Sequence, residues 1–210
     1  MKYALIGCGR ISVNHITAAQ ANGLDIVAVS DMLPEKMDEK KQKFHLGDST
    51  KTYTDYREML VKEQPELVAI CTESGKHAAI ALDCIDAGCH VIIEKPIALS
   101  LADADEIIRR AKAKGVKVCA NHQNRFNKAI QKIRDALEKK RFGKMFYGTA
   151  HIRWCRDKNY YTQAPWRGTW EQDGGALMNQ CIHNIDLLRW MMGDEIDTVV
   201  GRSEEHTSEL

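Results

Sequence analysis

A long apolar segment is lacking: no run approaches the roughly 18 residues that a membrane-spanning helix needs. A strong charge of one sign is lacking too, since 30 Lys and Arg oppose 29 Asp and Glu among 210 residues. This balance argues against nucleic acid or a membrane surface as a partner. The first apolar run ends at Gly7, which is too short for the core of a signal peptide. We therefore expect a cytoplasmic protein.

A pattern of paired cysteines is lacking as well. The 7 cysteines are an odd number, and most of them lie inside apolar runs, which is typical of reduced thiols in a cytosolic protein. Cys84, Cys89 and His90 come nearest to a metal-binding cluster, but a second pair of ligands is missing. We expect no bound metal.

Short β-branched runs alternate with helical segments through residues 1–120. The runs are nearly continuous in apolar character, as in sheets that helices cover on both faces. This alternation predicts an α/β fold with a doubly wound parallel sheet of the Rossmann type. The expected strands cover residues 3–7, 25–31, 66–72, 90–96 and 116–120, and the expected helices cover residues 11–22, 34–44, 77–87 and 101–114.

The pattern changes over residues 121–201, which predict the start of an α+β domain. We expect a helix over 127–140, a half-exposed strand over 144–154, a long loop, and a helix over 174–193. Only one strand is expected in this region, and a single strand does not form a stable sheet. We therefore expect most of the sheet of such a domain to be missing here.

Residues 202–210, RSEEHTSEL, lack the periodicity of a helix or a strand. They agree residue for residue with one reading frame of a common sequencing-library adapter. Chance is a poor explanation for this agreement. We therefore expect a non-native tail that interrupts the native sequence near Gly201.

The stretch GCGRIS follows the first expected strand and opens the first expected helix. Gly7 permits a tight turn, and Gly9 lets the backbone approach the pyrophosphate of a dinucleotide at the helix N-terminus. Asp31 ends the second strand, where a carboxylate accepts from a ribose 2′-hydroxyl. Met32 follows, with no basic residue for a 2′-phosphate, which favours NAD over NADP. A nucleotide fold that is empty or binds another ligand is the alternative.

Two more polar stretches follow strands of the same expected sheet. In CTESGKH, Thr72 and Ser74 lie at the carboxyl end of the sheet, where ligands bind in such folds, although Ser74 is alternatively a helix cap. In EKP, Pro96 ends a strand directly after Lys95. Either Lys95 stabilises a developing alkoxide on a substrate, or it is a surface lysine paired with Glu94.

The helix expected over 174–193 carries Asn179 and His183 on one side of an otherwise apolar face. Either His183 is a hydrogen-bonded core histidine, or it points into a cleft and handles a proton. The loop before this helix offers guanidinium groups for anions and aromatic faces for stacking, with aromatic packing as the alternative for the tryptophans. Its residues of interest are Arg156, Tyr160, Tyr161, Arg167 and Trp170.

These motifs together resemble the Gfo/Idh/MocA oxidoreductase family. They are GCGRIS, CTESGKH, EKPIALS, NHQNRF and GGALMNQCIHNIDLL, in the family's order, and the resemblance covers residues 1 to about 201. It implies an NAD-binding Rossmann domain at 1–120 and a partial C-terminal domain at 121–201 for substrate binding and oligomerisation. It also implies homo-oligomers, either dimers or tetramers.

The resemblance also implies roles for individual residues. Lys95 and His183 match the catalytic lysine and histidine. Many members carry an aspartate in place of Asn179 that orients the histidine. We therefore expect His183 to be a weaker base and Lys95 to share the proton transfer, with either of the two residues as the base. The implied cofactor-binding residues are Gly7, Gly9, Arg10, Ile11, Asp31, Thr72, Ser74, His77, Glu94 and Lys95. The implied substrate-binding residues are Arg125, Tyr160, Arg167, Trp170, Asn179 and His183.

Within the family, the stretches NHQNRF and YYTQAPWRGTWEQDGGALMNQCIHNIDLLRWMMG look most like the sugar-nucleotide branch. That branch oxidises the 3-hydroxyl of a UDP-N-acetylaminouronic acid to a 3-keto sugar with NAD, on the way to bacterial surface polysaccharide. The alternatives are an inositol or sugar dehydrogenase, an NAD-dependent glycoside hydrolase, and a nucleotide-binding regulator without turnover.

Overall fold

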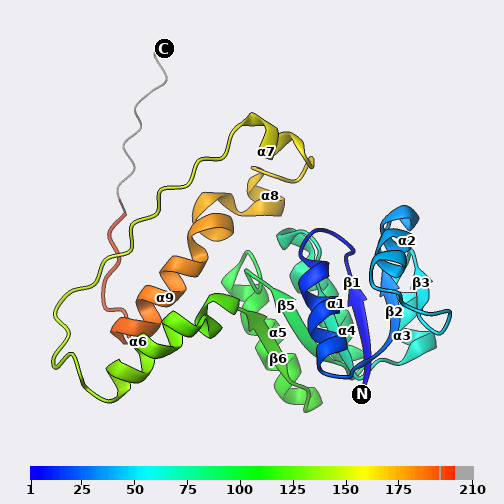
Figure 1. The fold of residues 1–210 in the computed structure, drawn as a ribbon, viewed down its shortest axis with the longest axis horizontal. Helices are drawn as coiled ribbons and strands as arrows, with labels where there is room; N and C mark the ends of the chain where they lie inside the picture. The colour runs from blue at the N-terminus through cyan, green and yellow to red at the C-terminus, as the bar shows by residue number, and fades with distance from the viewer. Residues whose placement is uncertain (194, 202–210) are drawn as a thin grey trace.

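The computed structural model describes residues 1–193 and 195–201, and a six-stranded parallel sheet forms its core (Figure 1). The strand order is β3-β2-β1-β4-β5-β6, the order of a Rossmann fold, which confirms the expected α/β class. The strands are β1 (Lys2–Ile6), β2 (Asp25–Ser30), β3 (Lys51–Tyr53), β4 (Leu67–Ile70), β5 (His90–Glu94) and β6 (Val118–Asn121).

Helices cover both faces of this sheet. Successive strand residues point to opposite sides, and both sides of these strands are apolar, so each face packs against helices. Tyr3 and Leu5 of β1 lie in one apolar cluster, together with residues of α1 (Ser12–Ala21) and α2 (Pro34–Lys43). Ala4 and Ile6 lie in the other cluster. That cluster also includes residues of α3 (Tyr56–Glu63), α4 (His77–Asp86) and α5 (Leu101–Lys114). The sheet is therefore doubly wound, as its continuous apolar strands predict.

The strand β3 and the helix α3 are additions to the predicted pattern. β3 spans three residues at the edge of the sheet and pairs only with β2, which leaves its polar side chains outside the core. The side chain of Asp55 caps α3 by accepting from the Arg57 amide at 2.8 Å, and Met59 and Leu60 of α3 are buried. A short polar strand carries almost no periodic signal, but the capping aspartate is a signal that was overlooked.

The chain after β6 is helical where it is regular. It contains the 3-10 turn η2 (Gln123–Phe126), then α6 (Lys128–Glu138), α7 (Lys158–Thr162) and α8 (Trp170–Asp173). A π-helical turn, η3 (Leu177–Cys181), leads into α9 (Ile182–Met192). The expected loop thus contains two short helices, and the expected helix over 174–193 is divided by the π turn.

The strand expected over 144–154 is wrong. These residues run as an extended segment without regular secondary structure (Figure 1), and no described strand lies beside them. A strand needs a hydrogen-bonding neighbour, which local alternation of side chains does not supply.

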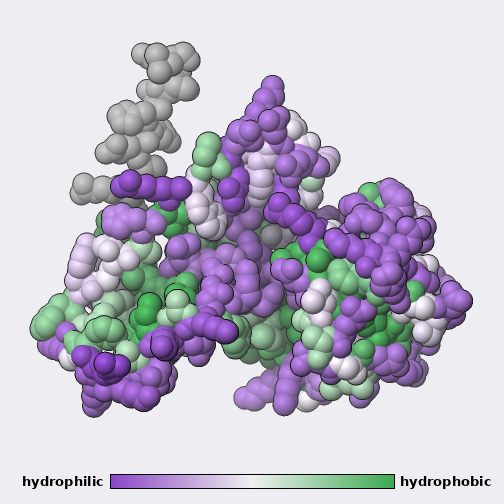
Figure 2. Space-filling view, viewed as in Figure 1, coloured by the Kyte–Doolittle hydropathy of each residue, from purple (hydrophilic) through white to green (hydrophobic). Residues whose placement is uncertain are grey.

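The two parts of the chain differ in how they bury apolar side chains. Figure 2 shows apolar side chains gathered on the surface at the lower left, in the region of α6 and α9. Exposed large side chains of this region include Ile133, Phe142, Phe146, Tyr147 and Met192. Among the described residues, no helix is both long and apolar enough to cross a bilayer. The expected non-native tail, 202–210, lies outside the described residues.

Candidate active site

The glycine-rich turn between β1 and α1 leaves open space in front of its backbone. Gly7 has φ of +93°, and a Cβ there would lie 2.7 Å from the carbonyl carbon of Cys71, so only glycine fits. A Cβ on Gly9 would meet no atom within 4 Å. Within the described part of the chain, the amides of Gly9, Arg10 and Ile11 donate to no protein acceptor. These open amides at the start of α1 fit the pyrophosphate of a dinucleotide.

Asp31 follows β2 and lies beside this turn. Its Oδ2 accepts a hydrogen bond from the amide of Cys8 at 2.7 Å, and its Oδ1 accepts from the amide of Leu33 at 3.0 Å. The carboxylate therefore braces the turn, and its remaining lone pairs can accept further hydrogen bonds.

The residues after β4 are largely committed to contacts within the protein. Ser74 is buried in the short turn η1 (Ser74–Lys76), and its side chain caps no helix, so that alternative is wrong. The His77 ring has Nδ1 2.7 Å from Pro96 O and Nε2 3.1 Å from Thr72 O. Burial lowers the pKa of His77, so the neutral ring donates to one of these carbonyls. His77 thereby joins the ends of β4 and β5.

Glu94 ends β5 inside a buried polar cluster. Its Oε1 lies 2.7 Å from His15 Nε2 and accepts from Asn121 Nδ2 at 2.7 Å. Burial opposes ionisation of Glu94, but these hydrogen bonds outweigh it and lower the carboxyl pKa. The cluster links α1, β5 and β6 and buries Glu94, whose Oε2 accepts from the backbone amide of Lys95 at 3.4 Å.

Lys95 reaches from the end of β5 to the other part of the chain. Its Nζ donates to Asn179 O at 2.6 Å and lies 3.4 Å from Asn179 Oδ1. Burial lowers the pKa of this half-buried lysine, while the charges of Glu94 and Asp173 oppose the shift. The alternative of a surface lysine paired with Glu94 is therefore wrong.

His183 is buried in α9, and its Nδ1 has no hydrogen-bond partner among the described residues. Its ring packs edge-on against His122, with 6.2 Å between centroids. Burial lowers the pKa of His183, and the charges of Lys95 and His122 lower it further. The ring is therefore neutral near pH 7 and able to accept a proton. Asn179 does not orient it, because the π turn directs the Asn179 side chain toward Lys95 instead.

The predicted substrate residues fall into two groups. Arg125 forms a bidentate pair with Asp186, at 2.8 and 2.5 Å, and stacks on Trp190. Arg167 instead donates to Tyr160 Oη at 2.7 Å and stacks on that ring, while its Nε is buried without a partner among the described residues. Arg125 is thus committed to a protein carboxylate, whereas Arg167 retains a free donor.

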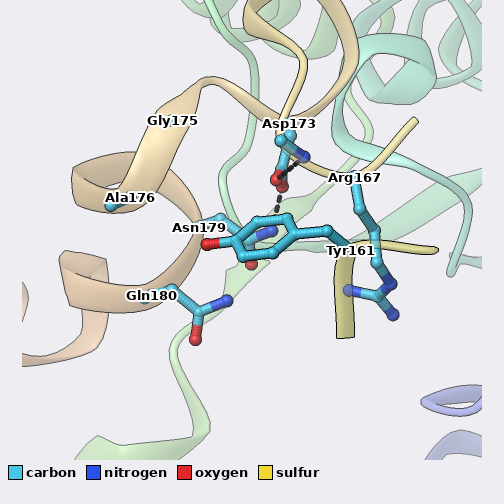
Figure 3. Close-up of a pocket in the computed structure, with 8 residues that line it drawn as sticks. Tyr161, Arg167, Asp173, Gly175, Ala176, Asn179 and Gln180 are labelled. Atoms are coloured by element: carbon cyan, nitrogen blue, oxygen red, sulfur yellow. Dashed lines mark hydrogen bonds between the residues drawn. The ribbon is translucent and has the colours of Figure 1, made fainter. Parts of the chain in front are cut away.

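A cavity of about 490 Å³ opens beside Asn179 and Arg167 (Figure 3). Asp173 enters it from the end of α8, and its carboxylate accepts from the Asn179 amide. Trp170 is 82% exposed and its ring lies over Gly175, so it is outside this lining. The lining residues are Tyr161, Arg167, Gly168, Asp173, Gly175, Ala176, Asn179 and Gln180.

Three residues near the site were missed from sequence: His15, His122 and Asp173. His15 shares the buried stripe of α1 with Ser12 and Ile16, so it presented the same signal as His183, a polar residue on a buried helical face. Asp173 precedes a pair of glycines in a region expected to be a loop, and nothing in its local pattern predicts burial.

Comparison with known proteins agrees with this geometry. Residues 1–122 match the family model described as oxidoreductase family, NAD-binding Rossmann fold, and residues 130–209 match the GFO/IDH/MocA C-terminal domain. The chain is 28% identical over 202 residues to myo-inositol 2-dehydrogenase of Thermotoga maritima, covering 95% of this chain and 57% of that protein. It is 31% identical over 194 residues to D-apiose dehydrogenase of Paraburkholderia graminis, covering 92% and 50%.

A solved structure is also similar across both parts of the chain. The WlbA dehydrogenase of Bordetella pertussis, crystallised with NADH and UDP-GlcNAcA, is 35% identical with a TM-score of 0.86. The match covers 92% of this chain and 55% of that one. The chain thus spans about half the length of the relatives it matches.

Proposed function

This chain belongs to the Gfo/Idh/MocA oxidoreductase family, and on that premise we propose that it acts in the NAD-dependent oxidation of the 3-hydroxyl of a UDP-N-acetylaminouronic acid. The observation that carries the proposal is the contact between Lys95 and Asn179. It brings the carboxyl end of β5, beside the glycine-rich turn, against the helical segment that bears His183. A lysine donor and a neutral imidazole are thereby supplied to one site by two distant parts of the sequence.

The cofactor site is formed by residues of the Rossmann domain. The open amides of Gly9, Arg10 and Ile11 would hold the pyrophosphate, and Asp31 would hold the adenosine ribose. Thr72, Ser74, His77 and Glu94 would lie toward the nicotinamide. NAD, when bound, accepts hydride from the substrate carbon.

Lys95 and His183 handle the hydroxyl group of the substrate. Lys95 Nζ donates a hydrogen bond to the hydroxyl oxygen and stabilises negative charge that develops there. His183 accepts the hydroxyl proton, because burial keeps its ring neutral near pH 7. The carbon–oxygen bond gains double-bond character as the proton and the hydride leave.

Arg167 supports an anionic substrate. Arg167 lines the cavity beside Asn179, and its buried Nε has no partner among the described residues. A guanidinium binds carboxylate or phosphate through paired donors. Similarity to a dehydrogenase crystallised with UDP-GlcNAcA supports the same substrate class. Tyr160 holds Arg167 in place, and Gln180 donates to the same hydroxyl at 2.8 Å.

Oxidation of a free polyol is the second candidate. It is favoured by the 28% identity between this chain and the T. maritima myo-inositol 2-dehydrogenase, in a match that covers 95% of this chain. The two candidates differ in whether turnover requires the UDP group.

The test is absorbance at 340 nm after the chain is mixed with NAD and UDP-N-acetylglucosaminuronic acid. Matched reactions contain N-acetylglucosaminuronic acid without UDP, or myo-inositol, and NAD binding is measured separately by fluorescence. We expect NADH to form only with the UDP-sugar. NADH from myo-inositol alone would establish the polyol candidate. A flat trace from NAD-bound protein with every substrate would contradict both dehydrogenase proposals.

A further inference from the structure

Asp173 is a buried carboxylate that no step above uses. It ends α8 with 3% of its surface exposed. Its Oδ2 accepts from the amide of Gly168 at 2.7 Å, and its Oδ1 accepts from Asn179 Nδ2. A buried carboxylate is costly unless hydrogen bonds and a nearby positive charge compensate it. Here a hydrogen-bonded route to a cation runs through Asn179 to Lys95.

The carboxylate decides which end of the Asn179 amide faces Lys95. A carboxylate only accepts hydrogen bonds, so it holds the NH₂ group of Asn179 and turns Oδ1 away from itself. That oxygen then lies 3.4 Å from Lys95 Nζ, beside the 2.6 Å contact to the Asn179 carbonyl. Without the carboxylate the amide is free to rotate and present its own donors to the ammonium group.

The position of Asp173 is fixed by contacts between α8 and the Rossmann domain. A Cβ on Gly75 in η1 would lie 2.6 Å from both Glu171 O and Gln172 Oε1, so α8 sits directly on that turn. A Cβ on Gly174 would lie 2.6 Å from the Leu99 side chain, just after β5. Both contacts anchor Asp173 to the strand ends that carry the site.

We propose that Asp173 is a positioning residue that acts through Asn179 to hold the Lys95 ammonium at the reacting end of β5. The proposal rests on the proposed function only in treating Lys95 as the reacting lysine. It gives Asn179 a structural role between a carboxylate and a cation, in addition to any contact with substrate.

Charged and titratable side chains from several elements lie near Lys95 and influence its ammonium group. Glu94 precedes it on β5, Asp173 ends α8, and Arg167 lies in the segment before α8. His122 and His183 also face it, and both have lowered pKa values caused first by burial. Glu94 bonds to His15, to Asn121 and to the Lys95 backbone amide, whereas Asp173 is linked to the Lys95 ammonium group through Asn179.

The test measures how readily Lys95 reacts with acetic anhydride between pH 7 and 11. The folded, full-length chain is labelled first, and its peptides are then analysed by mass spectrometry after digestion. Lys112, an exposed lysine of α5, is the internal reference. In Asp173→Asn we expect Lys95 to be labelled about threefold faster than in wild type near pH 8, because loss of the carboxylate favours the neutral amine. Glu171→Gln, which removes an exposed charge from the same helix, is the matched control and leaves Lys95 labelling unchanged.

Asn179→Ala provides a second variant if Asp173→Asn does not fold. It cuts the link but keeps the buried carboxylate, and we expect faster labelling of Lys95 here too. Lys95 labelling that equals wild type in whichever of these variants folds, as shown by circular dichroism, would overturn the proposal. So would an equal increase in Glu171→Gln. Labelling requires no substrate, so a failure of the proposed dehydrogenase activity does not alter the outcome.

Discussion

The Rossmann domain and the chain that follows it bury different kinds of residue. Up to residue 122 the buried set is mostly apolar and forms two clusters, one on each face of the sheet. Beyond residue 122 the only described residues that are buried are Asp173 and His183. One is a carboxylate and the other an imidazole, and both lie beside Lys95 or its partner. Within residues 123–193 and 195–201 the second part therefore buries polar groups and has no apolar core of its own.

This difference separates the origin of stability from the location of the chemistry. Stability comes from the two apolar clusters of the Rossmann domain. The candidate site forms where the second part contacts the ends of β4, β5 and β6. Buried polar groups are expected at such a boundary, because chemistry needs charged groups in a place that excludes water.

The largest expected effect comes from removing one reacting group from each part. Lys95→Met and His183→Ala should each slow NADH formation about 10³-fold, or about 4 kcal/mol in the barrier, since positioned acid–base groups contribute this much. The dissociation constant of NAD, measured by fluorescence, should stay within about twofold. Lys112→Ala, at an exposed position of α5, is the control. A parallel loss of NAD affinity in either variant would assign that residue to binding.

Stability should respond to core deletions in the first part only. Leu5→Ala removes a fully buried side chain of β1 and should lower the free energy of unfolding by about 3 kcal/mol. Phe146→Ala removes a side chain that is 83% exposed and should change it by less than about 0.5 kcal/mol. Urea unfolding followed by circular dichroism measures both. A large loss in Phe146→Ala would mean that the second part has a core of its own in solution.

The buried pair between His15 and Glu94 should contribute more to the free energy of unfolding than an exposed pair of similar geometry. Glu94→Gln should destabilise the chain by about 2 kcal/mol, because it weakens hydrogen bonds to a buried charge. The control is Glu58→Gln, whose exposed partner is Lys62, and it should cost less than about 0.5 kcal/mol. Equal urea midpoints for the two variants would show that the buried cluster is energetically neutral.

The smallest expected effect is a dependence of stability on pH near neutrality. Burial lowers the pKa of His183, His122 and His77 below the ordinary value of 6.5. Their contribution is therefore complete above about pH 6.5 and is lost as the pH falls toward the folded-state pKa, because the unfolded chain binds protons first. The stability that Glu94 and Glu73 contribute through their lowered pKa values is complete above about pH 4.5 and is lost only as the pH falls below it.

The urea concentration at the unfolding midpoint should accordingly decrease as the pH is lowered from 7.5 to 5.5. His183→Asn should flatten that fall by less than about 1 kcal/mol. A midpoint that rises over the same interval would show that the imidazoles gain partners on folding and have raised pKa values.

Much of the fold and part of the candidate site could be predicted from sequence. Apolar strands followed by helices predict the parallel sheet, and Gly7, Asp31 and Lys95 fall at strand ends, where such sheets bind ligands. The strand over 144–154 could not be judged locally, because a strand depends on a neighbour. Asp173 could not be found either, since its burial depends on the packing of α8 against η1.

The sequence by itself determined the Rossmann sheet, the glycine-rich turn and the residue types that carry the chemistry, because these depend on periodicity and on backbone rules that act over a few residues. Only the tertiary structure decided what each polar group contacts. It assigned Asn179 to Lys95 and Asp173 instead of to His183, and Glu94 to His15 and Asn121. The reason is that packing between segments far apart in the chain sets those partners. The π-helical turn and the contact between α8 and η1 place Asn179 and Asp173, and the pairing of β5 with β6 places Asn121 beside Glu94.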